Sequence, residues 1–158
     1  MVQTKELLRQ QTTRRIVAGT AELRAAIVDI VSRAQRTLAI LTPDLETAIY
    51  EHDDFLAALK RFVLAKSFTR VRVLITEPGR AVKPGNQFVQ VGQRLSSYIE
   101  FRNLPDAFRP EVQAFCIADG DSIVYRANHA TGEGMLAQHA PEIAKLYLAE
   151  FDDLWQQG

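Results

Sequence analysis

The chain has 158 residues, of which 47% are hydrophobic and 24% charged, and its formal net charge is zero. This composition excludes a disordered or collagen-like chain and favours one globular domain, which at this length buries roughly two thirds of its unfolded surface. The single cysteine excludes an internal disulfide, and no run approaches the ~20 apolar residues of a membrane span. We expect one domain over 14–158 in the cytoplasm, without membrane contact, and a flexible polar lead-in over 1–13 that lacks the apolar core of a signal peptide.

Short apolar runs alternate with amphipathic segments through the first two thirds of the chain. The run 37–41 is almost continuously apolar, as in a strand covered on both faces. The segment after Gly19 repeats its apolar residues at helical spacing, with Thr20 as the expected N-cap. The expected elements are strands at 16–18, 37–41, 71–75 and 98–102, and helices that begin at Thr20, at Asp53 or Asp54, and at Asn86.

A hairpin and a helix end the chain. The apolar run 112–118 and the return strand 123–126 are separated by Asp-Gly-Asp-Ser, a strong turn sequence. Residues 128–140 contain two glycines and no period, which predicts a loop, and Pro141 fits the first position of the last helix. Strands alternating with helices predict an α/β fold, with a mixed, mostly parallel sheet and helices on both faces.

The hairpin also carries a recognisable spacing of residues. Val112, Ala114 and Asp119 stand at the positions of a His-x-Lys-x4-Asp motif, and Asn128 follows the return strand. This pattern resembles one half of the phospholipase D-like superfamily, in which the His attacks a phosphodiester and the Lys holds the phosphate charge. Since Val and Ala do neither, the resemblance implies the fold without that catalysis. The step from Asp119 to Asn128 is also shorter than in the superfamily.

Over residues 14–156 the chain resembles a family of uncharacterised bacterial domains, sometimes fused to acetyltransferase domains or encoded beside them. The stretches that carry this resemblance are 42–46, 94–97, 99–102 and the C-terminal segment. The superfamily builds its active site from two halves, so the resemblance implies a homodimer. It also points to an acetyltransferase domain as a partner.

Six polar residues are candidate ligand contacts: Asp44, Arg94, Arg102, Asp119, Arg126 and Asn128. Asp44 follows a strand end, where open α/β sheets bind ligands, but it suits a turn equally well. The turn role is favoured for Asp119. The arginines have the geometry to hold a phosphate or carboxylate. On strands, Arg102 and Arg126 favour partners within the fold, and Glu100, Asp119 and Asp121 are candidates.

No metal site or cofactor is predicted. The histidines, His52, His129 and His139, lie far apart without cysteines or clustered carboxylates, unlike the ligands of a zinc site. His129 is expected to face solvent. The glycine-rich phosphate loops of nucleotide-binding proteins are absent from the sequence.

Two functions therefore compete. The missing His and Lys favour a non-catalytic module that acts by binding or dimerisation. Alternatively, the chain binds phosphate or nucleic acid through Lys83, Arg94, Arg102 and Arg126. The ten basic and three acidic side chains of segment 60–110 favour this function. The acidic segment 111–158 offers a complementary dimer face, although solvated helix surfaces explain the same charges. An enzyme using Asp44, Asp119 and His129 is a less favoured third possibility.

Overall fold

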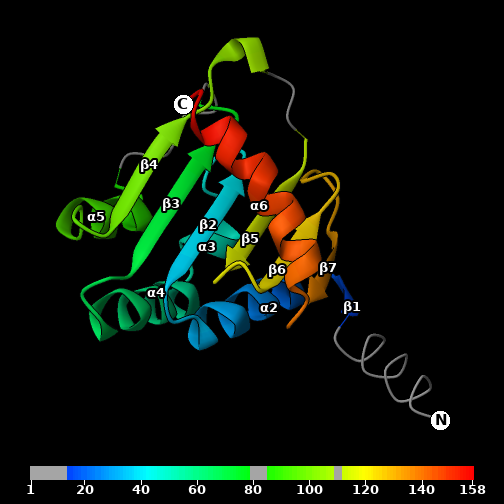
Figure 1. The fold of residues 1–158 in the computed structure, drawn as a ribbon, viewed down its shortest axis with the longest axis horizontal. Helices are drawn as coiled ribbons and strands as arrows, with labels where there is room; N and C mark the ends of the chain where they lie inside the picture. Colours follow the sequence, from blue (N-terminus) through cyan, green and yellow to red (C-terminus); the bar gives the residue numbers. More distant parts are fainter. Residues whose placement is uncertain (1–13, 79–84, 109–111) are drawn as a thin grey trace.

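The computed structural model describes residues 14–78, 85–108 and 112–158. A seven-stranded sheet in the order β1-β7-β6-β5-β2-β3-β4 lies at its centre. Figure 1 shows helix α6 across one face of this sheet and the other helices behind it. The predicted lead-in over 1–13 and the candidate Lys83 lie outside the described residues.

The elements follow the predicted pattern closely. The strands are β1 (Arg14–Ala18), β2 (Thr37–Thr42), β3 (Arg70–Ile75), β4 (Ile99–Asn103), β5 (Ala114–Ala118), β6 (Ser122–Arg126) and β7 (Glu133–Ala137). The helices are α2 (Thr20–Arg33), α3 (Thr47–Tyr50), α4 (Asp53–Ala65), α5 (Gln87–Arg94) and α6 (Pro141–Trp155), with a 3₁₀ turn at Asp106–Phe108. Within the described residues, no helix is long and apolar enough to cross a membrane.

The mixed α/β sheet is confirmed, but the expected excess of parallel strands is not observed. Strand β3 pairs in parallel with β2 and β4, whereas the other neighbouring pairs are all antiparallel. The predicted loop 128–140 instead contains β7, which extends the hairpin and pairs with β1. Gly134 explains why this strand lacks an apolar pattern, because a Cβ there would lie 2.9 Å from the Tyr125 carbonyl oxygen.

Strand β2 is covered on both faces, as its continuous apolar run predicts. Leu38 and Ile40 face the layer formed with α2, α4 and α5, and Leu41 faces α6. Cys116 on the neighbouring β5 is fully buried, and burial raises the pKa of its thiol to about 12. The central strands therefore form a rigid support for the loops at both ends of the sheet.

The start of helix α2 differs in detail from the prediction, whereas that of α4 agrees with it. The N-cap of α2 is Gly19, with φ 86°, rather than Thr20. Glycine adopts this backbone conformation without the strain that a side chain would cause. Helix α4 begins at Asp53, one of the two predicted positions, and the His52 ring nitrogen accepts a hydrogen bond from the Asp54 amide.

Candidate functional site

The polar residues of the hairpin meet the carboxyl ends of the parallel strands. Leu41 near the end of β2 lies opposite Phe115 on β5, and Ala114 lies opposite Arg126 on β6. The start of β5 and the end of β6 therefore lie beside the loop that follows β2. Val112, just before β5, is exposed, whereas Ala114 is buried.

A buried ion pair occupies this end of the sheet. Both terminal nitrogens of Arg126 donate to Glu46, one to each carboxylate oxygen, and the arginine side chain is 6% exposed. Burial alone would lower the pKa of Arg126, but the hydrogen bonds and charge of Glu46, with smaller contributions from Tyr50 and Asp44, raise it above its usual value. Glu46 follows Leu45, a buried residue with φ 60°, so a left-handed turn after β2 places the carboxylate. Arg126 is fully charged and fully committed to the fold.

His129 lies in the same cluster. Its side chain is 9% exposed, so the prediction that it faces solvent is wrong, and its Nε2 lies 3.8 Å from a carboxylate oxygen of Glu77. The amides of Thr76 and Glu77 donate to the carbonyls of Thr42 and Pro43, which joins the exits of β3 and β2. The hydroxyls of Thr42 and Thr76 are buried without a hydrogen-bond partner in the described part of the chain.

We call this group the carboxyl-end cluster: Thr42, Glu46, Thr76, Glu77, Arg126 and His129. A cavity of about 180 Å³ opens against its Arg126, Glu46 and His129 side, between α2 and the loop after β6. Buried polar groups of this kind are stabilising only when they are paired. Arg126 and Glu46 are already paired here, whereas Nε2 of His129 is buried without a hydrogen-bond partner among the described residues.

Asn128 and Asp44 flank the cluster. The Asn128 side-chain oxygen accepts from the Ala130 amide at 2.9 Å, and its carbonyl accepts from the Thr131 hydroxyl. Asn128 thus forms a turn after β6. Asp44 is half-buried and close enough to contribute to the high pKa of Arg126.

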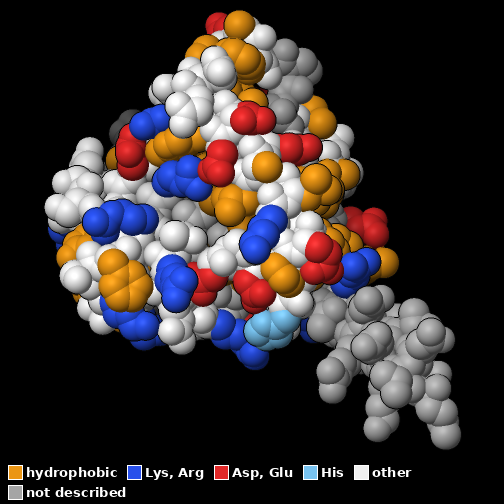
Figure 2. Space-filling model, viewed as in Figure 1, with side chains coloured by type: hydrophobic (Ala, Val, Ile, Leu, Met, Phe, Trp, Pro, Cys, Tyr) orange, Lys and Arg blue, Asp and Glu red, His pale blue; other side chains and the backbone are white. Residues whose placement is uncertain are grey.

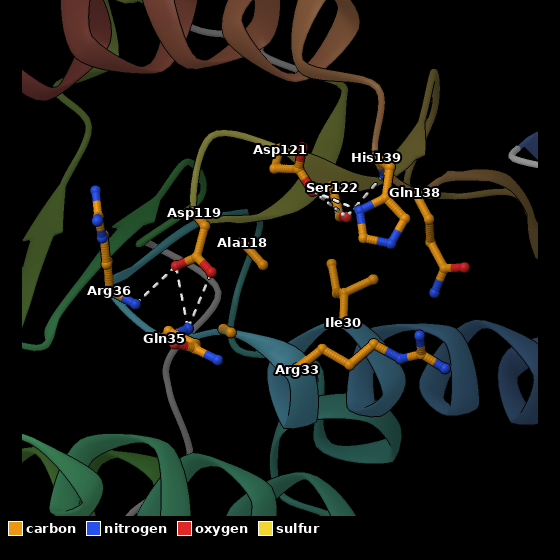
Figure 3. A pocket seen from close by; sticks show the side chains of 11 residues that line it. Ile30, Arg33, Gln35, Arg36, Ala118, Asp119, Asp121, Ser122, Gln138 and His139 are labelled. Carbon is orange, nitrogen blue, oxygen red and sulfur yellow. Dashed lines mark hydrogen bonds and ion pairs between the residues drawn. The ribbon is translucent and has the colours of Figure 1, made fainter.

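Asp119 lies at the opposite end of the sheet. Its carboxylate accepts hydrogen bonds from the amides of Gln35, Arg36 and Thr37 at 2.9, 2.7 and 3.0 Å, two of which Figure 3 shows. Its backbone has φ 58°, in the left-handed region that Asp tolerates better than most residues. Asp119 therefore ties the hairpin turn to the start of β2.

The pocket beside Asp119 has a volume of about 320 Å³. Figure 3 shows Ile30 and Arg33 of α2 on one side of it and Ser122 and His139 on the other. The His139 Nδ1 lies 3.1 Å from a carboxylate oxygen of Asp121, and Arg33 pairs with Asp29. Of the charged side chains around this pocket, His139 and Asp121 pair with each other, whereas Asp119 is bound by backbone amides.

The remaining arginine candidates differ in their surroundings. The Arg102 guanidinium lies 4.2 Å from the centre of the Trp155 ring, donates to the Trp155 carbonyl at 2.8 Å and pairs with Glu100. Glu100 was among the expected partners. Arg94, in contrast, is exposed at the end of α5, and no carboxylate of the described residues pairs with it. Arg94 is therefore the candidate arginine without a carboxylate partner in the described part of the chain.

Sequence reasoning missed Glu46, Glu77, Thr42 and Thr76 as members of the cluster. The stretch 42–46 and the residues after 71–75 follow predicted strands, which is where open α/β sheets gather polar groups. Their position directly after predicted strands was the sequence feature that could have indicated these residues. It could not indicate that Glu46 pairs with Arg126, 80 positions away in the chain.

The architecture defines a phospholipase D-like fold. A solved phospholipase D family member, Nuc from Salmonella typhimurium, superposes with a TM-score of 0.64 at 16% identity, covering 92% of this chain and 96% of that one. NucT from Helicobacter pylori gives a TM-score of 0.62 at 12% identity, over 91% of this chain and 96% of that one.

The chain belongs to the family described as a domain of unknown function, DUF7931, whose model matches residues 19–158. No curated protein sequence matches it. Another similar structure is TrmBL2, an archaeal chromatin protein described as having a novel mode of DNA binding, with a TM-score of 0.64 at 15% identity. The match covers 91% of this chain, which spans about half (52%) of that protein.

Proposed function

We propose that this chain is a non-catalytic phospholipase D-like module that acts by binding. The observation that carries the proposal is the pairing of Arg126 with Glu46 where the resemblance would set catalytic residues. The positions that correspond to the motif His and Lys hold Val112 and Ala114. Neither side chain attacks phosphorus or holds phosphate charge, and the neighbouring guanidinium is neutralised by its carboxylate.

The test of this proposal is hydrolysis of phosphodiesters. The chain is incubated at high concentration with bis(4-nitrophenyl) phosphate and with labelled single-stranded DNA, and the His129→Ala variant is measured beside it. We expect no turnover above buffer for either protein. Turnover that copurifies with the chain and disappears in His129→Ala would overturn the proposal, because His129 is the histidine of the carboxyl-end cluster.

A homodimer is the first specific form of this binding role. The acidic segment 111–158 and the basic segment 60–110 offer complementary faces to a second copy. Light scattering at micromolar concentration measures the molar mass, and the mass of a monomer would contradict the proposed homodimer.

Binding to an acetyltransferase domain is the second specific form of this role. Titration calorimetry with such a domain tests it separately.

Recognition of a phosphate-bearing ligand is the second candidate function. The exposed cations Lys60, Arg61, Lys66, Arg70 and Arg94 within segment 60–110 favour it. The similarity to an archaeal chromatin protein described as binding DNA supports it as well. Arg102 and Arg126 remain candidates in this proposal, although each already has a carboxylate partner within the fold. Salt-dependent binding of labelled DNA and RNA tests this candidate, since phosphate contacts weaken steeply with salt.

A further inference from the structure

Exposed cations gather at the amino ends of the parallel strands, where helices α2, α4 and α5 end. Figure 2 shows Lys and Arg side chains around the lower left of the molecule, near the junction of α4 with β3, and many Asp and Glu side chains toward the opposite side. We call this region the amino-end surface: Arg36, Lys66, Phe68, Arg70, Arg94 and Tyr98.

Short contacts make most of this surface continuous. The Arg70 amide donates to the Arg36 carbonyl at 3.0 Å, which joins the entries of β3 and β2. The Lys66 ammonium donates to the side chain of Gln35, the neighbour of Arg36, at 3.1 Å. On the other side, the Arg70 guanidinium lies 5.8 Å from the centre of the Tyr98 ring. Tyr98 follows the end of α5, where Arg94 lies.

The cations of the amino-end surface are not neutralised. Arg36, Lys66, Arg70 and Arg94 have no carboxylate partner within the described residues. The nearby carboxylate of Asp119 is occupied by three backbone amides. Basic residues at helix carboxyl ends are favoured by the helix dipole alone, so the charges by themselves do not indicate a ligand.

The exposed aromatic residue distinguishes this surface from an ordinary helix end. Phe68 lies in the turn between α4 and β3 and is 54% exposed, although most large apolar residues of this fold are buried. The Lys66 ammonium lies 5.5 Å from the centre of its ring. Tyr98 is half-buried on the far side of Arg70. Aromatic rings interleaved with cations are the arrangement that stacks bases and holds phosphates of a single strand.

We propose that the amino-end surface binds single-stranded nucleic acid, with Phe68 and Tyr98 stacking on bases and Arg36, Lys66, Arg70 and Arg94 contacting phosphates. A duplex hides the faces of its bases, so exposed rings favour a single strand. This inference rests on the second candidate function and locates it. It sets the ligand at the end of the sheet opposite the carboxyl-end cluster, beside the pocket of Figure 3, which Gln35 and Arg36 help to line.

Fluorescence anisotropy with labelled single-stranded DNA and RNA of about 16 nucleotides tests the inference. The same DNA as a duplex is measured in parallel, at low and near-physiological salt. The variants are Phe68→Ala and the double variant Lys66→Ala/Arg70→Ala. Their matched controls on α6 and β1 are Leu146→Ala, which removes another exposed apolar side chain, and Lys145→Ala/Arg15→Ala. Circular dichroism verifies that each variant is folded.

We expect the single strand to bind more tightly than the duplex and Phe68→Ala to weaken binding by roughly five- to a hundredfold. The slope of log affinity against log salt should fall by about 0.7 for each phosphate that the double variant no longer binds. The controls should bind as the parent does. Equal binding by parent, Phe68→Ala and the double variant would overturn the location but leave nucleic-acid recognition standing. Preference for the duplex would overturn the stacking role, and no binding at low salt would overturn the second candidate function itself.

Discussion

The two ends of the sheet use arginine in opposite ways. At the carboxyl end, Arg126 is 6% exposed and bound to Glu46 through both nitrogens. At the amino end, Arg36, Arg70 and Arg94 are exposed without a carboxylate partner among the described residues. A buried charge must be paired, whereas an exposed one is stabilised by water. The Arg126–Glu46 pair is thus held within the fold, whereas the exposed arginines of the other end agree with the ligand-binding role that we propose for it.

Removing Arg126 tests the carboxyl end of the sheet and is expected to cause the largest loss in the free energy of unfolding. Arg126→Ala leaves Glu46 without its partner, and we expect a loss of about 3–5 kcal/mol in the free energy of unfolding. Urea denaturation monitored by circular dichroism measures it. In a double-mutant cycle with Glu46→Gln, the second substitution should cost little once Arg126 is absent. Additive losses would mean that the pair is not coupled.

Removing Asp119 is expected to have the next largest effect. Asp119→Ala removes the acceptor of three amides and strains the left-handed backbone, so we expect a loss of about 2–3 kcal/mol in the free energy of unfolding. Asp119→Gly relieves the backbone strain but does not restore the hydrogen bonds, and Asp119→Asn keeps one acceptor oxygen. Denaturant midpoints should therefore rank Asn above Gly and Gly above Ala. Wild-type stability in Asp119→Ala would contradict this role.

A substitution in the packing of α5 against β4 is expected to change the free energy of unfolding by a smaller amount. A Cβ at Gly92 of α5 would lie 2.2 Å from the Phe101 ring, which packs on Phe88. Helix propensity alone predicts that Gly92→Ala stabilises the protein by up to ~1 kcal/mol. Because the clash should outweigh this gain, we expect a net loss of about 1 kcal/mol. The double variant Gly92→Ala/Phe101→Leu should recover part of it, and a raised Tm in Gly92→Ala would contradict the packing.

The smallest change in the free energy of unfolding is expected for Arg94, an exposed arginine at the amino end of the sheet. Arg94→Ala removes an exposed cation that forms no ion pair with the described residues, so the free energy of unfolding should change by less than about 0.5 kcal/mol. Differential scanning calorimetry compares it with Arg102→Ala, which also removes the interaction with Trp155. Equal and large losses in both variants would mean that Arg94 has a structural role.

The sequence by itself determined most of the local structure. Apolar spacing predicted the amphipathic helices, the continuous run of β2 and the hairpin at Asp119, because burial and turn chemistry depend on residues close together in the chain. The apolar run 112–118 predicted a buried strand of the hairpin, and Cys116 within it is fully buried. Strand β7 escaped prediction because Gly134 is selected by its close approach to β6 rather than by apolar spacing.

Only the tertiary structure decided which charges are paired and which are free. The partner of Arg126 comes from a turn after a different strand, and the partner of Arg102 includes a carbonyl at the end of α6. Periodicity carries no information on such contacts, since they depend on how the chain crosses the sheet. The same sheet brings Arg36, Lys66 and Arg70 together at the amino end of its parallel strands, because neighbouring parallel strands begin at the same end.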